Sequence, residues 1–473
     1  MSPLIISRLF ILSALLLVTN SLVTSQPKMV VEVFRHGARG PIYGANDVWG
    51  NYVGQLTPVG MRMHYLLGVA LKDKYPHLLG KYDPAKIIIR STNYNRTIMS
   101  AYSQLYGIYG GTGPGFTGAH ADVLSIPPYA DYDSNNTMRN LTNDAALPGK
   151  FQVLPLHVDS LTTDKLLRGS EGCPPSWDPW SFENLGDEET ASVFKNDLAE
   201  ISKKMKAAGL KVESLDDLAA YGDTAIANKF QNTPLPGGIS IDSQEYKDLK
   251  FATEWWFFKA FISGKNEAAL HSLNLFNGIR DYINGRLNGT NVVDFAFLSG
   301  HDDTLAPVLV AFNITTKECL LANYRAQKTG EDIPYPSCVY PGFASNLVFE
   351  VYGDNADEAQ IKFYYNGVGQ AICGKTGENN NTCGFKEFSK WITELTKGYT
   401  VSDYNKKCEI KVGGAKPIIL VNTYKKLNDA IGAICVVLVV SLLGTCFANL
   451  RKQGIIRSQG LLKNASGSGF TQL

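Results

Sequence analysis

The chain has 473 residues and carries 45 Lys and Arg against 44 Asp and Glu, a formal net charge of +1. This length suits about three domains of ordinary size. The near balance of charge argues against a nucleic-acid-binding protein, because such proteins usually show a basic excess or a basic stripe. With 44% hydrophobic and 19% charged residues, the chain is too apolar to be disordered and long enough to bury a sizeable core.

The first 25 residues are typical of a secretory signal peptide. Arg8 is their only charge, a short apolar run follows over Leu9–Val18, and Val23 and Ser25 are small enough for a cleavage site. The alternative is a buried N-terminal helix. The run is too short to span a bilayer, and polar residues follow it at once, so we expect residues 1–25 to be a signal peptide.

A second apolar segment, Ala430–Ala448, has 19 residues without a charge. As a helix it would span roughly 28 Å, close to the hydrocarbon thickness of a bilayer. The 449–473 tail holds four basic residues and no acid, so the positive-inside rule places it in the cytosol. A buried core helix and a removable lipid-anchor signal are the alternatives, and the 25 residues after the span argue against the second.

Together these segments predict a single-pass membrane protein with residues 26–425 on the lumenal or extracellular side. Lysosome or vacuole and plasma membrane remain open as destinations. Residues 26–429 then carry 40 basic and 44 acidic side chains, a net charge of −4. The overall neutrality is therefore a sum over two sides of a membrane.

Cysteine usage agrees with an oxidising compartment. Six of the eight cysteines lie between the signal and the span: Cys173, Cys319, Cys338, Cys373, Cys383 and Cys408. An even number there predicts three disulfides, for which about 15 pairings are possible. Cys373 with Cys383 and Cys319 with Cys338 are natural local pairs, which would leave Cys173 with Cys408. No spacing of Cys or His predicts a metal, and we expect no cofactor.

The same region holds six glycosylation sequons. We expect glycans on several of five of them: Asn135, Asn140, Asn288, Asn313 and Asn380. The sixth, Asn95, is expected to lie unmodified in a packed helix.

Short apolar runs rich in β-branched residues predict the strands of an α/β core. Three of them are Met29–Phe34, Lys86–Ile89 and Val292–Leu298, and Asn346–Tyr352 is expected as an edge or late strand. Helical patterns follow the first two runs. One starts at Pro58 with Thr57 as its N-cap, and the other covers Thr97–Tyr106. This alternation predicts a mostly parallel central sheet with helices on both faces.

The middle of the chain has a different pattern. Residues from about 121 to 275 combine loops rich in Pro and Asn with charged amphipathic stretches such as Ser192–Lys206 and Leu215–Phe230. We expect a mainly helical cap domain there, inserted between two core segments at about 26–120 and 276–410.

The segment Arg35–Pro41 (RHGARGP) follows the first predicted strand. Ligands of open α/β sheets bind beyond the carboxyl ends of the strands. Two guanidinium groups here flank one imidazole, and Arg suits planar, bidentate recognition of phosphate. Gly37 and Gly40 allow close backbone approach.

Two more strand ends carry similar chemistry. Arg90 ends the second strand, and His301 with Asp302 follows the third. If the three ends converge, they form a pocket with three arginines, two histidines and one acid. Such a pocket suits a phosphate dianion, a nucleophile and a proton donor.

At this point the sequence resembles the histidine acid phosphatases. Arg35–Pro41 matches their RHGxRxP signature, and Gln55–Thr57 with Gly60 matches the stretch that follows it. The segments Ile89–Thr92 and Arg96–Ala101, and later His301-Asp302, match further motifs in the same order. The resemblance covers about residues 29–410, and the signal, disulfides, span and short tail look like the lysosomal acid phosphatase arrangement.

The resemblance implies a role for each site residue. His36 would attack phosphorus and become a phosphohistidine, and Asp302 would protonate the leaving oxygen. The phosphoryl oxygens would be held by Arg35, Arg39, Arg90 and His301. The implied partner is a small phosphate monoester, with the membrane reached through one helix, no nucleic acid, and a homodimer as an allowed assembly.

Asp303 departs from the family, which usually has a neutral residue at this position. A second carboxyl could raise the pKa of Asp302, or it could face away, which is the interpretation we favour. Two alternatives to a general phosphomonoesterase share the motifs. One is a phytase-like enzyme acting on inositol phosphates, and the other is a receptor-like ectodomain without turnover. The presence of both His36 and Asp302 argues against the second.

Overall fold

The computed structural model describes residues 26–43, 49–115, 145–169, 188–262, 264–375 and 380–408. All of them belong to one compact unit, Met1–Ile410. The predicted signal peptide, the predicted span, Asn135, Asn140 and Cys173 lie outside the described residues. In the part that is described, no helix has the length and apolar character needed to cross a membrane.

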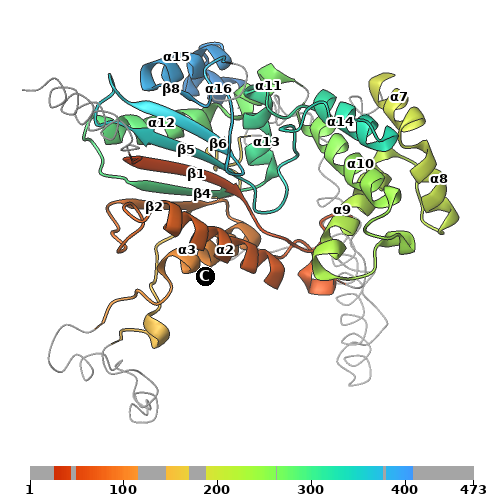
Figure 1. The fold of residues 1–473 in the computed structure, drawn as a ribbon, viewed down its shortest axis with the longest axis horizontal. Coiled ribbons are helices and arrows are strands. Elements are labelled where there is room, and N and C mark those ends of the chain that lie inside the picture. The colour runs from red at the N-terminus through yellow and green to blue at the C-terminus, as the bar shows by residue number, and fades with distance from the viewer. Residues whose placement is uncertain are drawn as a thin grey trace, which may run out of the picture. The chain divides into compact units, whose positions relative to one another are not determined.

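A single central sheet organises the fold (Figure 1). Its strands are β1 Met29–Arg35, β2 Ile87–Ser91, β3 His157–Val158, β4 Phe295–Gly300, β5 Asn346–Tyr352, β6 Gln360–Tyr365, β7 Val368–Gly369 and β8 Thr382–Gly384. The order is β3-β2-β4-β1-β5-β6-β7, and β8 also pairs with β6.

The sheet is mixed rather than mostly parallel, which corrects our expectation. β3, β2, β4 and β1 run parallel to one another, whereas β5 is antiparallel to β1, and β6 to β8 continue with antiparallel pairings. β5 has the predicted bounds but lies inside the sheet between β1 and β6. Of the two expected positions, edge or late strand, it is a late strand of the core and not an edge strand.

Helices cover both faces of the sheet, as the sequence predicts. On one face lie α2 Pro58–Lys74 and α3 Asn95–Tyr109, and on the other α12 Leu273–Leu287, α13 Asp302–Ala311 and α15 Phe385–Leu395 (Figure 1). Neighbouring residues of β1 serve different sides: Val31 packs with α12 and α13, and Val30 with α2 and α3. Both faces are buried, which explains why the strands read as continuous apolar runs.

The other helices of the described residues are α7 Glu188–Asn196, α8 Ala199–Ala207, α9 Leu215–Gln231, α10 Gln244–Phe261, α11 Lys265–His271, α14 Lys317–Thr329 and α16 Val401–Cys408. The same residues include short 3₁₀ turns at Gly50–Tyr52, Pro148–Lys150 and Pro236–Gly238. α7 to α10 form the helical part of the predicted cap, and α10 packs on both α9 and α14. The range 121–275 is not purely cap, because β3 joins the core sheet. The predicted stretch Ser192–Lys206 is two helices, α7 and α8.

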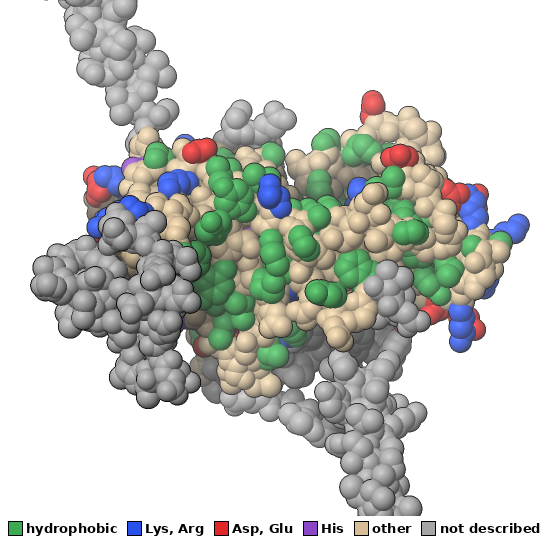
Figure 2. All heavy atoms as spheres, turned by 90° about the horizontal axis from the view of Figure 1, so that it is seen from below, with side chains coloured by type: hydrophobic (Ala, Val, Ile, Leu, Met, Phe, Trp, Pro, Cys, Tyr) green, Lys and Arg blue, Asp and Glu red, His purple; other side chains and the backbone are tan. Residues whose placement is uncertain are grey.

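Figure 2 shows hydrophobic side chains spread over the face that α2 and α3 form. Aromatic residues of this face, Tyr65, Tyr102 and Tyr106, are partly exposed. The rings of Tyr106 and Phe151 lie 6.1 Å apart, so this aromatic surface continues onto the 145–153 segment.

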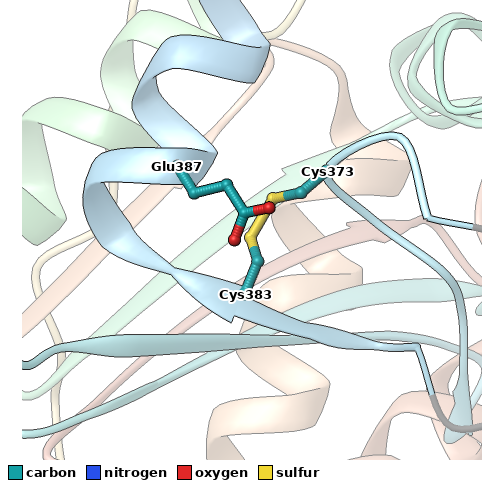
Figure 3. A group of neighbouring side chains, drawn as sticks. All are labelled: Cys373, Cys383 and Glu387. Carbon is teal, nitrogen blue, oxygen red and sulfur yellow. A yellow bond between two sulfur atoms is a disulfide. The ribbon is translucent and has the colours of Figure 1, made fainter.

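Two of the expected disulfides are present: Cys319 with Cys338, and Cys373 with Cys383. Glu387 of α15 lies beside the second pair (Figure 3). The two sulfurs bind each other, so this group does not offer free thiolates to a metal ion. The pairing of Cys173 with Cys408 stays a prediction. Among the sequons, Asn288 and Asn313 are exposed and Asn380 is half-buried.

Candidate active site

The carboxyl ends of three adjacent parallel strands bring the predicted residues together. β4 lies between β1 and β2, and Arg35 at the end of β1 pairs in register with Gly300 at the end of β4. His36 therefore follows β1 at the same edge where His301 follows β4. Their ring centroids are 5.5 Å apart.

Tight backbone packing shapes the loop after β1. A Cβ on Gly37 would lie 2.4 Å from the carbonyl oxygen of Gly60 in the first turn of α2, so a side chain has no room there. Thr57 caps α2 by accepting a hydrogen bond from Gly60, and its hydroxyl donates to the carbonyl of Ala38. Thr57, the predicted N-cap of α2, thus also holds the loop after β1 in place. The predicted close approach at Gly37 is confirmed, and its partner is the chain's own backbone.

His36 is held as a neutral imidazole with one defined tautomer. Its Nδ1 lies 2.8 Å from the carbonyl oxygen of Gly37, which can only accept, so Nδ1 carries the proton and Nε2 the lone pair. Burial lowers the pKa of His36 well below its usual value, and the nearby charges of Arg96, Arg35 and Arg39 lower it further. Nε2 is therefore available as a nucleophile in acid solution.

Arg35 and Asp302 form the closest ion pair of the site. Arg35 Nη2 lies 2.6 Å from Asp302 Oδ2, and the hydroxyl of Tyr340 donates to the same oxygen at 2.8 Å. Arg35 Nη1 donates to the carbonyl of Pro341, and its guanidinium stacks on Phe343 at 4.7 Å. The segment before β5 thus orients both partners.

The pKa of Asp302 reflects two opposing effects. Burial raises it, but the charges of Arg35 and Arg39 and the hydrogen bond from Tyr340 outweigh burial and hold the pKa below its ordinary value. Asp302 is accordingly a carboxylate in the site without substrate.

Arg39 is bound to the helical segment. Its Nη2 lies 2.9 Å from Asp223 Oδ1 of α9, and both side chains are almost fully buried. Asp223 also accepts the backbone N–H groups of Ile42 and Tyr43 through Oδ2. One carboxylate therefore fixes Arg39 and the exit of the catalytic loop together.

Hydrogen bonds to both ring nitrogens fix the orientation of His301. Arg96 Nη2 donates to Nδ1 at 3.3 Å, which leaves the proton on Nε2, 2.8 Å from Thr92 Oγ1. The ring of Tyr94 meets His301 edge-on at 5.0 Å and carries the guanidinium of Arg96 over its face at 4.4 Å. Burial lowers the pKa of His301 well below its usual value, and Arg96 and the other guanidinium groups add to the shift.

The side chain of Arg90 contacts a different partner from the predicted phosphate. It forms an ion pair with Asp159, beyond the end of β3. Among the described residues, its hydrogen bond and ion pair are with Asp159 and not with His36, His301 or Asp302. Its predicted contact with phosphate stays a prediction.

The third guanidinium that the structure does bring to the histidines belongs to Arg96, in the first turn of α3. It lies in the matched segment Arg96–Ala101, so the signal was present in the sequence. Asp223, Tyr340 and Phe343 also belong to the site, and no local motif marks them.

Asp303 is electrostatically linked to Asp302 and to the arginines of the site, and the interpretation that its side chain turns away stays a prediction. α13 begins at Asp302, so both carboxyls lie in the first turn of a helix, where neighbours do not alternate between opposite sides. Burial and the charge of Asp302 raise the pKa of Asp303 to about 6, against the opposing effects of Arg168 and Arg96. Its Oδ1 is buried without a hydrogen-bond partner among the described residues.

Asn95 also differs from expectation. It opens α3 as predicted for a helical position, but its side chain is exposed and donates to Gln55 Oε1 at 3.3 Å. It is therefore not packed inside the fold.

Comparison with known proteins gives related acid phosphatases. The chain is 23% identical to the human "Lysosomal acid phosphatase" over 433 residues, which is 89% of this chain and 88% of that protein. It is 24% identical to the human "Prostatic acid phosphatase" over 310 residues, 62% of this chain and 71% of that protein.

Among solved structures, the phytase from Citrobacter braakii has a TM-score of 0.53 at 14% identity, covering 80% of this chain and 99% of that one. The Klebsiella sp. ASR1 phytase has the same TM-score at 16% identity, covering 83% and 100%. At these identities the likeness supports the fold alone. Residues 43–366, more than half of the chain, match the histidine phosphatase superfamily (branch 2), and the protein belongs to this family.

Proposed function

We propose that the protein is an acid phosphatase that hydrolyses phosphate monoesters through a phosphohistidine at His36. The observation that carries the proposal is the state of His36. It is neutral, its Nε2 lone pair is free of the Gly37 hydrogen bond, and three guanidinium groups affect its pKa. Catalysis of phosphoryl transfer depends chiefly on positioning and on stabilising charge around the phosphoryl oxygens.

In the first step, His36 Nε2 attacks phosphorus. The N–P bond forms as the bond from phosphorus to the ester oxygen breaks, and the leaving oxygen takes that electron pair. Nδ1–H keeps its hydrogen bond to Gly37, so the imidazole that becomes cationic is already oriented. Water then attacks phosphorus, the N–P bond breaks and phosphate is released.

Arg35, Arg39 and Arg96 are the proposed ligands of the phosphoryl oxygens, with His301 as a fourth donor. Arg39 and Arg96 are supported from behind, by Asp223 and by the face of Tyr94 respectively. Such preorganised donors stabilise transition-state charge without reorganising during the reaction. Arg90, which the sequence also suggested as a phosphate ligand, is not one of these four proposed donors, because its observed partner is Asp159.

Asp302 is the proposed proton donor, and its protonation depends on substrate. In the substrate-free site Arg35 keeps it ionised. Bound phosphoryl oxygens share the donors of Arg35, which weakens this effect and lets Asp302 hold a proton. Because Asp303 keeps a proton up to about pH 6, the two neighbouring carboxyls together retain one proton in acid solution.

We also propose that the catalytic domain lies outside the cytosol and is held at a membrane by residues 430–448. The disulfides Cys319–Cys338 and Cys373–Cys383 support an oxidising compartment. The relatives named "Lysosomal acid phosphatase" support a lumenal site, with lysosome as the first destination to test.

The test is hydrolysis by the purified full-length protein at about pH 5, where an ordinary carboxyl with a pKa near 4 is still partly protonated. Substrates would be p-nitrophenyl phosphate, an alkyl phosphate and inositol hexakisphosphate, with His36→Ala as the control. We expect turnover of the monoesters by the wild type and none above background by the variant. Equal, negligible rates in both would leave a non-catalytic ectodomain, and turnover confined to inositol hexakisphosphate would favour the phytase-like alternative.

A further inference from the structure

A carboxylic acid that the proposed mechanism does not use lies in the middle of β1. Glu32 is completely buried, on the face of the sheet that α2 and α3 cover. Its neighbours along the strand on this face, Val30 and Phe34, belong to the apolar core there. Burying a carboxyl costs free energy unless hydrogen bonds or a proton compensate it. The burial of Glu32 must therefore be compensated by hydrogen bonds, by a proton, or by both.

Four polar groups form one continuous chain from Glu32 to the catalytic loop. Asn346 Nδ2 donates to Glu32 Oε1 at 2.8 Å, and Gln104 Nε2 donates to Glu32 Oε2 at 2.5 Å. Gln104 Oε1 lies 3.0 Å from His64 Nδ1, and His64 Nε2 lies 3.1 Å from the carbonyl oxygen of Arg35. Glu32, Gln104 and His64 are all fully buried. We call these three residues the Glu32 network.

The donors and acceptors of this chain can be assigned from its fixed end. The carbonyl of Arg35 can only accept, so His64 Nε2 carries a proton. If Gln104 turns its oxygen to His64, then His64 must also donate from Nδ1, which makes it a cation beside a Glu32 carboxylate. If Gln104 turns its nitrogen to His64, its oxygen needs a donor, so Glu32 must be protonated and His64 is neutral. In both arrangements the chain is complete only with one additional proton.

The neutral arrangement is the one that this environment favours. Separating two charges in an apolar layer is more costly than keeping both groups neutral. This arrangement needs the Gln104 amide turned end for end, with Oε1 toward Glu32 and Nε2 toward His64, and the two ends of an amide have nearly the same shape. Burial raises the pKa of Glu32 to about 7 and lowers that of His64 to about 4, in the same sense. At acidic pH the proton is therefore on Glu32.

The far end of the network holds the peptide group on which the site depends. The carbonyl of Arg35 accepts from His64, and the N–H of His36, on the other side of the same peptide bond, donates to the carbonyl of Gly300 at 3.1 Å. This peptide joins the residue that pairs with Asp302 to the proposed nucleophile. Rotation of the peptide would displace both side chains.

A second carboxyl over this face of the sheet, Glu350, has its own partners, whereas the hydroxyls of Tyr82 and Tyr109 are buried there without a hydrogen-bond partner among the described residues. Glu350 of β5 accepts from the hydroxyl of Tyr75 at 2.7 Å and pairs with Lys74 at 2.9 Å. Tyr352 and Tyr364 also bond to Glu350. The influences on the pKa of Glu32 come from burial, Asn346 and Gln104, and those on His64 come from burial, Gln104 and Arg35.

We propose that the Glu32 network is a one-proton positioning device that holds the Arg35–His36 peptide in its catalytic orientation and weakens this hold when the proton is lost at alkaline pH. Without the proton, the single amide of Gln104 cannot satisfy both the carboxylate and the unprotonated Nδ1 of His64. The effect of the network on catalysis rests on the proposed function. The presence of one buried proton in the network does not rest on it and can be measured separately.

The decisive variant is Glu32→Gln, because an amide can reproduce the hydrogen bonds of the protonated acid but cannot titrate. We expect Glu32→Gln to retain activity at about pH 5 and to raise the ratio of kcat/KM at about pH 7.5 to that at about pH 5 by about threefold or more. Gln104→Met removes the link between Glu32 and His64. In the Gln104→Met protein, a further Glu32→Gln change should no longer alter the alkaline side of the pH profile of kcat/KM. Glu350→Gln is the matched control, a buried carboxyl on the same face with no contact to the loop. It should leave the pH profile unchanged.

Thermal unfolding supplies a readout that needs no activity. The pKa of Glu32 in the folded chain, about 7, lies above the 4.5 of an ordinary glutamate, so its stabilising effect is present below about pH 4.5 and is lost as the pH rises to about 7. The wild type and Glu350→Gln should therefore lose melting temperature across this range more steeply than Glu32→Gln. Equal slopes in all three would overturn the buried proton. A normal slope difference with an unchanged kinetic profile would overturn its link to catalysis. Failure of all forms, wild type included, to hydrolyse monoesters would instead contradict the proposed function.

Discussion

Arginine crowding keeps the proposed nucleophile neutral. Arg96, Arg35 and Arg39 lower the pKa of His36 on top of the effect of burial, and Nδ1 is committed to Gly37. The same guanidinium groups would hold the phosphoryl oxygens, so binding the substrate and activating the nucleophile rely on one set of charges. This coupling gives predictions for single side chains.

Arg90 near the end of β2 and Arg96 in the first turn of α3 can be compared directly, because only Arg96 contacts one of the two histidines. We predict that Arg96→Ala lowers kcat/KM by about 100-fold, the usual effect of removing one donor to transition-state charge. Arg90→Ala, which breaks a half-exposed ion pair with Asp159, should change it much less. Steady-state kinetics on p-nitrophenyl phosphate would test this. An equal loss in both variants would restore Arg90 as a phosphate ligand.

Asp303→Asn tests the neighbouring carboxyls. Removing the negative charge of Asp303 should make the ionised form of Asp302 more stable and so lower the pKa of Asp302. The falling limb of kcat/KM, measured from about pH 4 to about pH 7, should then shift to lower pH. A limb that stays in place, or moves to higher pH, would mean that Asp303 has no part in holding the proton.

At the scale of elements, the sequence predicted where strands begin and end better than it predicted which strands pair. β5 has its predicted bounds because a buried strand is marked by a short segment rich in apolar and β-branched residues, here interrupted only by Glu350. Its antiparallel pairing with β1 is a long-range property that periodicity does not encode. In the same way, the RHGARGP segment marks the proposed nucleophile, whereas Asp159, the partner of Arg90, and Asp223, the partner of Arg39, lie far away in the chain.

α9 is the element through which the helical segment contacts the catalytic loop. Besides Asp223, it contributes Asn228, which accepts from Trp49 Nε1, and Gln231, which donates to Thr57 Oγ1. These three contacts lie along one helix, and all reach the chain between β1 and the start of α2. The helical segment therefore supports the site as well as covering part of the core.

We predict that Asp223→Ala destabilises the fold by about 3 kcal/mol, because it leaves the buried guanidinium of Arg39 without its carboxylate. Activity should fall with it, through both kcat and KM. Asp217→Ala on the same helix is the control. Asp217 is an exposed capping residue, so its loss should cost about 1 kcal/mol and leave kcat/KM unchanged. Urea unfolding and kinetics on the two variants would test this, and equal activity losses would show that Asp223 acts only through stability.

At the scale of the whole molecule, one mixed sheet with helices on both faces places a compact cationic site at the ends of three parallel strands. The site is carried by a chain whose residues 26–429 have an excess of acid. Its guanidinium groups are therefore a local feature, supported by buried carboxylates such as Asp223 and Asp302. Overall charge excluded nucleic acid as a partner but gave no indication of this anion site.

The central claim is that phosphate passes through His36. A rapid mixing experiment with a phosphomonoester labelled in its phosphoryl group, quenched in alkali where phosphohistidine survives, tests it most directly. The wild type should show label on the protein, located at His36 by peptide mapping, and Asp302→Ala should still be labelled by a substrate with a good leaving group. His36→Ala should show no label and no turnover. Turnover by the wild type without label on His36, or continued turnover by His36→Ala, would contradict the claim.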